Sequence, residues 1–92
     1  MRRAARVDAN QEQIVSALRA ANAYVWIIGL PVDLLVGYNN RTFLVEIKDG
    51  PKKKLTKLQE DFFKNWTGGT LCRIDGPEAA LRMIGVLNEA VN

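Results

Sequence analysis

One stretch decides the fold of this chain: residues 29–48, which read GLPVDLLVGYNNRTFLVEIK. Residues 33–38 and 42–48 are two runs rich in apolar and β-branched side chains, which favours two strands. Asn39 and Asn40 stand between these runs, and asparagine tolerates the positive φ angles of a two-residue turn better than other residues with a side chain. The stretch therefore predicts an antiparallel hairpin.

The remaining elements are expected on both sides of this hairpin. Apolar residues at helical spacing favour a helix over 8–22, and an aromatic and β-branched run favours a strand over 24–28. After the hairpin, a helix is expected over 56–66, a short strand over 70–74 and a last helix after the turn at 75–77. The order α-β-β-β-α-β-α predicts an α/β fold with a mixed four-stranded sheet flanked by helices.

Length and composition fit one small globular domain. The 92 residues are 48% hydrophobic and 25% charged, and residues 1–92 contain no linker long enough to divide them. The net charge of +3 is compatible with an anionic partner. No signal-peptide core or bilayer-length apolar run is present, so we expect a cytoplasmic protein with no membrane partner.

The absence of histidine excludes several kinds of site. Zinc sites built on histidine, Ser-His triads and Cys-His dyads cannot form. The lone cysteine, Cys72, cannot form an internal disulfide, and its apolar surroundings favour a buried structural thiol. Any catalysis must therefore rest on carboxylates, lysines, a tyrosine or a metal held by oxygen ligands.

The turn fixes which residues of the expected hairpin face each other. With Asn39 and Asn40 as the turn, the numbers of each facing pair sum to 79, so Asp33 lies opposite Glu46. Facing residues of an antiparallel pair share one face, with Cβ atoms about 5 Å apart. Two carboxylates at that separation repel each other unless a cation or another partner offsets their charges.

Lys48 joins this pair, because it is two residues beyond Glu46 and projects from the same face. The backbone carbonyl of Ile47 lies between the two side chains and is a further candidate ligand. Hard oxygen ligands suit Mg²⁺ or Mn²⁺, so Asp33, Glu46 and Ile47 form a candidate metal site. With Lys48 beside it, such a site suits phosphodiester hydrolysis.

A Glu-x-Lys pair on a strand is also common as a solvated charge pair with no chemical role. The flanking residues 34–36 and 43–45 are nearly all apolar, which predicts strands buried on both faces. A charge in such a place needs a partner or a function. Trp26 and Trp66 are expected in the core or in an interface rather than as platforms for bases.

These residues resemble the signature of the PD-(D/E)xK nucleases, and more narrowly that of standalone VRR-NUC domains, including small phage-encoded ones. In those domains the helix after the lysine strand carries Leu-(Ser/Thr)-x-x-Gln, which residues 55–59 match. The resemblance runs from about Asp8 to Trp66. It implies a restriction-endonuclease-like αβββαβα core and a metal-dependent DNA endonuclease, with Gln59 joining Asp33, Glu46 and Lys48 in the active site.

The chain departs from the family pattern at two places. Val32 stands where the family usually has proline directly before the aspartate. Family members also often carry an acidic residue in the first helix that completes the metal site, and here either Glu12 or Gln11 aligns with it. Glu12 also has the simpler interpretation of a solvated glutamate in the first turn of a helix.

The resemblance also bears on partners and location. Standalone VRR-NUC domains are similar to Holliday-junction resolvases, which implies a homodimer acting on branched DNA, in the host cytoplasm if the protein is phage-encoded. The one dense basic run consists of Lys52, Lys53, Lys54 and Lys57, which either contact phosphates or form a solvated loop. The alternatives to a nuclease are a non-catalytic nucleic-acid-binding module and an accessory subunit with a relic site.

Overall fold

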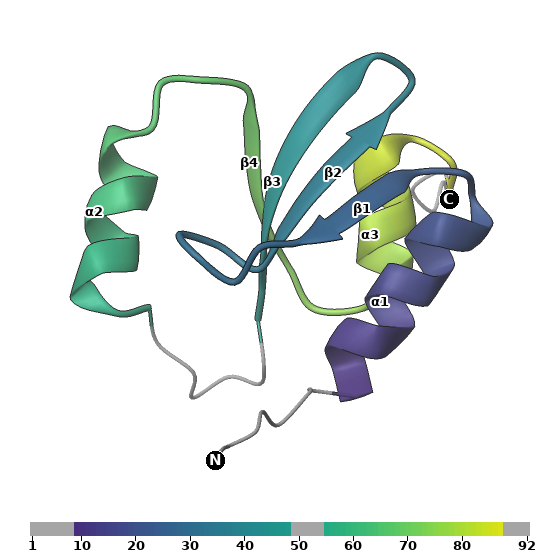
Figure 1. Ribbon diagram of the computed structural model, residues 1–92, viewed down its shortest axis with the longest axis horizontal. Coiled ribbons are helices and arrows are strands. Elements are labelled where there is room, and N and C mark those ends of the chain that lie inside the picture. Colours follow the sequence, from purple (N-terminus) through teal and green to yellow (C-terminus); the bar gives the residue numbers. More distant parts are fainter. Residues whose placement is uncertain (1–8, 49–54, 88–92) are drawn as a thin grey trace, which may run out of the picture.

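The computed structural model describes residues 9–48 and 55–87. Its elements follow the order α-β-β-β-α-β-α (Figure 1). Their bounds are α1 Ala9–Ala20, β1 Tyr24–Ile27, β2 Leu34–Tyr38, β3 Arg41–Ile47, α2 Lys57–Asn65, β4 Thr70–Ile74 and α3 Pro77–Ile84. The expected α/β fold with a mixed four-stranded sheet flanked by helices is confirmed, with end positions that differ by a few residues.

The strands lie in the order β1-β2-β3-β4 across one sheet. The pairs β1/β2 and β2/β3 are antiparallel, and β4 runs parallel to β3. Helix α2 forms the crossover between the two parallel strands (Figure 1). None of the helices described is long and apolar enough to cross a membrane.

The hairpin has the predicted turn and the predicted register. Asn39 and Asn40 have φ angles of 51° and 65°, which places both in the left-handed region. Leu34 pairs with Val45 and Tyr38 pairs with Arg41, so the residue numbers of facing pairs sum to 79. Extending this register by one residue brings Asp33 opposite Glu46.

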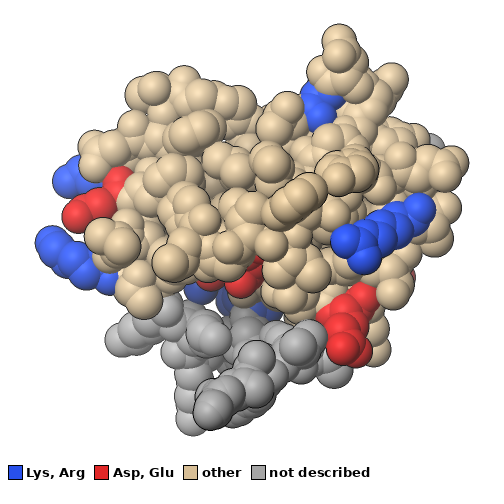
Figure 2. Space-filling model, in the orientation of Figure 1, with Lys and Arg blue, Asp and Glu red and all other residues tan. Residues whose placement is uncertain are grey.

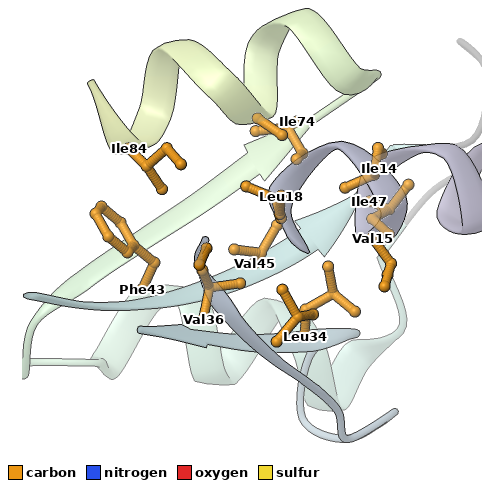
Figure 3. Close-up of a cluster of buried hydrophobic side chains, with 13 residues drawn as sticks. Ile14, Val15, Leu18, Leu34, Val36, Phe43, Val45, Ile47, Ile74 and Ile84 are labelled. Atoms are coloured by element: carbon orange, nitrogen blue, oxygen red, sulfur yellow. The ribbon is translucent and has the colours of Figure 1, made fainter. Parts of the chain in front are cut away.

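The core lies on one face of the sheet, under α1 and α3 (Figure 3). These two helices pack against each other as well as against the strands. The largest buried side chains include Leu18 from α1, Phe43 from β3 and Ile84 from α3. Alternation along the strands sends every second residue into this core, as in the series Phe43, Val45 and Ile47. We call this the core face.

The opposite face is less covered than the sequence suggested. Helix α2 lies on this side (Figure 1) and has no buried residue. Leu35 is 38% exposed and Leu44 is half-buried, so the prediction that both strands are buried on both faces is wrong. An apolar run shows that a strand contains few charged residues. It does not show that helices cover both faces of that strand. We call this the open face.

Three further expectations need adjustment. Trp26 and Trp66 are 57% and 38% exposed, so neither belongs to the core. Cys72 is half-buried rather than buried, and desolvation raises the pKa of its thiol. The first helix ends at Ala20, and Asn22, with a φ of 74°, turns the chain toward β1.

Candidate active site

Asp33 is fixed at the start of β2 by main-chain hydrogen bonds. Its N–H donates to the carbonyl of Val45 at 3.0 Å, and its own carbonyl accepts from the N–H groups of Ile28 and Gly29 at 2.9 and 3.1 Å. The preceding Val32 is fully buried, which anchors the chain just before the carboxylate. A buried aliphatic side chain therefore precedes the carboxylate at this position.

The side chain of Asp33 turns toward the end of β3. Its Oδ2 accepts a hydrogen bond from the N–H of Ile47 at 2.8 Å. The N–H and C=O of one strand residue point to the same side, so the Ile47 carbonyl is also directed to the side of β3 on which Asp33 lies. This orientation agrees with the candidate ligand set of Asp33, Glu46 and Ile47.

Glu46 is the buried charged residue of the described chain, with 8% of its surface exposed. Its Oε2 accepts a hydrogen bond from Nε2 of Gln59 at 3.2 Å, whereas its Oε1 is buried with no hydrogen-bond partner among the described residues. Burial raises the pKa of Glu46 to about 7, and the charge of Asp33 and a hydrogen bond with it act in the same direction. A proton or a cation is therefore favoured at this carboxylate.

Gln59 connects α2 to the carboxylate pair. Its backbone N–H donates to Oγ1 of Thr56 at 3.2 Å, and its Oε1 accepts from the N–H of Thr56 at 3.1 Å, which forms a capping box. Its Nε2 is left to donate to Glu46 and, at 3.4 Å, to the carbonyl of Pro31. The Leu-Thr-x-x-Gln motif thus begins the helix and also places an amide donor on Glu46.

Lys48 follows directly after β3, and its side chain is exposed. Its backbone N–H donates to the carbonyl of Ile74, which extends the pairing of β3 with β4 to this residue. Alternation places its side chain on the same face as that of Glu46. The structure brings Asp33, Glu46 and Gln59 together at the end of β3, and alternation puts Lys48 on the same face.

The other candidate residues are farther from this grouping or outside the described chain. Glu12 is exposed on α1, a helix of the core face, and the described residues include no cluster of three Cys, Asp or Glu side chains that could hold a metal. Gln11, the alternative, is half-buried on the same helix. Lys57 is exposed at the first position of α2. Lys52, Lys53 and Lys54 lie outside the described residues.

Arg73 belongs to the site although the sequence did not point to it. It is the partner of Glu46 in the parallel pairing of β3 and β4, so its side chain leaves the same face. Its positive charge lowers the pKa of Glu46, against the larger effect of burial. The only sequence signal was its place in the alternation of β4, and this could not be used before the pairing of the two strands was known.

The donor set fits a hard divalent cation. A buried carboxylate oxygen without a partner, a facing carboxylate and a main-chain carbonyl are all oxygen donors. Mg²⁺ keeps several water ligands and commonly uses only one or two carboxylates, so a third acidic side chain is not required. Asp33, Glu46 and Ile47 are the residues that would hold such an ion.

Comparisons with known proteins do not assign the chain to a family. No family model, no curated protein and no solved structure matched it.

Proposed function

We propose that this protein is a metal-dependent DNA endonuclease with a PD-(D/E)xK active site of the VRR-NUC type. The observation that supports the proposal most is the buried, raised-pKa Glu46 facing Asp33, with Lys48 on the same face. Two facing carboxylates, one of them desolvated, destabilise a sheet unless their charge is compensated. A purely structural role gives no reason for this arrangement, whereas cation binding does.

Each residue has a role in the proposed reaction. Mg²⁺ or Mn²⁺, when bound, would polarise a phosphoryl oxygen and lower the pKa of a coordinated water. The ammonium group of Lys48 orients the attacking water and offsets charge that develops on the phosphate. Gln59 holds the carboxylate of Glu46 in place through its 3.2 Å hydrogen bond. Arg73 adds a positive charge at the same face for the scissile or a neighbouring phosphate.

The proposed substrate is branched DNA, such as a Holliday junction, and the proposed acting form is a homodimer in the cytoplasm. Both follow from the resemblance to standalone VRR-NUC domains. The described residues form one such site, so cleavage of two strands of a junction calls for two copies. Lys57 and the basic run at 52–54 are the candidate contacts with phosphates flanking the cut.

The test compares two exposed lysines. Purified wild type, Lys48→Ala and Lys64→Ala are incubated with a branched DNA and Mg²⁺ or Mn²⁺. Lys64, in the last turn of α2, is exposed and outside the proposed site. We expect cleavage by wild type and Lys64→Ala, and a loss of about 10²–10³-fold in rate for Lys48→Ala, as for removal of one transition-state donor.

Other outcomes identify the rival functions. DNA binding without cleavage under either metal would reject the nuclease in favour of a binding module. Neither binding nor cleavage would point to an accessory subunit. Equal activity of Lys48→Ala and wild type would remove Lys48 from the mechanism.

A further inference from the structure

Strand β1 is an edge of the sheet with one free side. It pairs only with β2, and the sheet order ends with it. The carbonyl of Val25 accepts a hydrogen bond from Nη2 of Arg19 at 2.9 Å, so this carbonyl points away from β2. By alternation, the N–H and C=O of Ile27 point the same way. The free side thus offers backbone groups to an incoming strand.

The side chains of this edge are apolar and exposed. Tyr24 is 67% exposed, Trp26 57% and Ile27 51%, and Leu30 in the following loop is 71% exposed. The rings of Tyr24 and Trp26 lie side by side, with centroids 6.4 Å apart. Figure 2 shows few charged side chains in the middle of this view, with most of them at its margins. Natural edge strands usually carry charge or proline against unwanted pairing, and β1 carries neither.

A groove runs along the same edge. It has a volume of about 660 Å³ and is lined by Arg19, Asn22 and residues 23–27. Arg19 is the one charged residue in this lining. A polyanion such as DNA is poorly matched to a groove whose lining has a single cation. An extended strand is matched by the free backbone groups, and its apolar side chains are matched by the exposed Tyr24 and Trp26.

We propose that the occupant of this edge is the β1 strand of a second copy of the chain, paired antiparallel to form a continuous eight-stranded sheet. The surface is self-complementary, because an antiparallel pair of identical strands brings the aromatic row of each copy against that of the other. The pairing also replaces the Arg19 contact at Val25 with a main-chain donor.

The available area is consistent with a dimer. Aromatic side chains present about 150–250 Å² each, so Tyr24 and Trp26 at their exposed fractions offer on the order of 100–150 Å² apiece. With Ile27 and Leu30, each copy offers on the order of 400 Å², about half of the ~800 Å² per partner in a standard interface. The strand backbone and the lining of the groove supply further contact.

This arrangement has a consequence for the site that rests on the proposed function. Trp26 pairs with Leu35 and Leu35 with Leu44, so the aromatic row lies on the open face, as do Asp33 and Glu46. Two adjacent antiparallel strands are related by a two-fold axis perpendicular to their sheet. Both carboxylate pairs therefore lie on the same side of the eight-stranded sheet, where one branched DNA can contact both.

The test measures self-association without DNA. Sedimentation velocity over a range of concentrations is applied to wild type, to the double variant Tyr24→Glu/Trp26→Glu and to Leu58→Glu. Leu58 is an equally exposed apolar residue, at 71%, but it lies on α2. All substituted positions are exposed, and circular dichroism checks that each variant is folded. We expect wild type and Leu58→Glu to be dimers. The dimer dissociation constant of the double variant should be at least ~100-fold higher.

Three results would overturn the proposal. The first is a wild type that is monomeric at about 1 mM, which is the weak end of specific association. The second is a double variant whose dimer is as stable as that of wild type. The third is a monomeric Leu58→Glu variant, which would indicate that the interface lies on α2. If the double variant loses DNA binding but remains a dimer, the aromatic row would be a DNA-binding surface instead of the dimer interface. Lys48→Ala is expected to associate as wild type does, so a failure of the nuclease assay and a failure of the interface are separate results.

Discussion

The two faces of the sheet differ in what covers them. On the core face, α1 and α3 exclude water from an aliphatic cluster that includes Leu18, Val45 and Ile84. On the open face, α2 has no buried residue, and the sheet carries a carboxylate pair, an arginine and an exposed aromatic row. One face of this small sheet therefore carries the buried core, and the other carries charges that are unfavourable for folding.

The largest expected change in the free energy of unfolding comes from a leucine on the core face, compared with a leucine on the open face. Leu18→Ala removes a fully buried side chain of α1 and should lower the free energy of unfolding by about 2–5 kcal/mol. Leu58→Ala, on α2 at 71% exposure, should change it by no more than about 0.5 kcal/mol. Urea unfolding followed by circular dichroism measures both. Similar losses for the two variants would mean that α2 packs as tightly as α1.

The second prediction concerns pH. Folded Glu46 has a pKa of about 7 against an ordinary value of 4.5, so between these values the folded state holds a proton that the unfolded state has lost. The free energy of unfolding of the metal-free protein should therefore fall as pH rises from about 4.5 to about 7, and stay low above it. At about 1.4 kcal/mol per pKa unit, the total is about 3 kcal/mol.

Substitution separates this effect from other titrations. Glu46→Gln should abolish the decrease and be the more stable protein at pH 8, whereas Glu60→Gln, an exposed residue of α2, should keep it. Added Mg²⁺ should reduce the decrease in wild type, because a cation favours the carboxylate form. A stability that rises over this pH range would contradict the raised pKa.

The third prediction separates the two roles of Gln59, which are to cap α2 and to donate a hydrogen bond to Glu46. Gln59→Ala removes half of the capping box and the donor to Glu46, with an expected loss on the order of 1 kcal/mol in unfolding free energy. Thr56→Ala also weakens the cap but leaves that donor in place. The pKa of Glu46, followed by carbon NMR of its carboxyl group, should rise in Gln59→Ala alone. The same pKa in both variants would show that the amide acts only on the helix.

The smallest expected effect concerns two arginines on different elements. Arg73→Ala should weaken DNA binding by roughly threefold to tenfold and raise the pKa of Glu46, because its charge opposes burial at that carboxylate. Arg82→Ala, on α3, should change neither. Fluorescence anisotropy with labelled DNA measures the affinity. Equal losses for the two variants would indicate only a general effect of net charge.

The hairpin and its register could be predicted from sequence because they depend on local rules. Asn39 and Asn40 supply positive φ angles, and the two-residue period then determines every facing pair down to Asp33 and Glu46. The capping box of Thr56 and Gln59 is likewise a local pattern, although the contact of Gln59 with Glu46 was expected only from the family resemblance.

The rest depends on packing between distant segments. Arg73 reaches Glu46 through a parallel pairing whose register is set by how α2 returns the chain, and no local pattern in residues 70–74 contains that information. The incomplete cover of the open face is a similar case. Apolar residues such as Leu35 and Trp26 can be buried in a strand. Whether they are buried depends on the position of α2 over the sheet.

The two-residue turn at Asn39 and Asn40 has a consequence for how the chain tolerates insertions and deletions. If the turn keeps two residues, one residue gained or lost there shifts β3 by one position against β2, which exchanges its two faces. Phe43 and Val45 would then turn toward solvent, and Glu46 would enter the core and leave Asp33. A longer hairpin keeps both faces only if the added residues remain in the loop at the exposed tip, outside the paired strands.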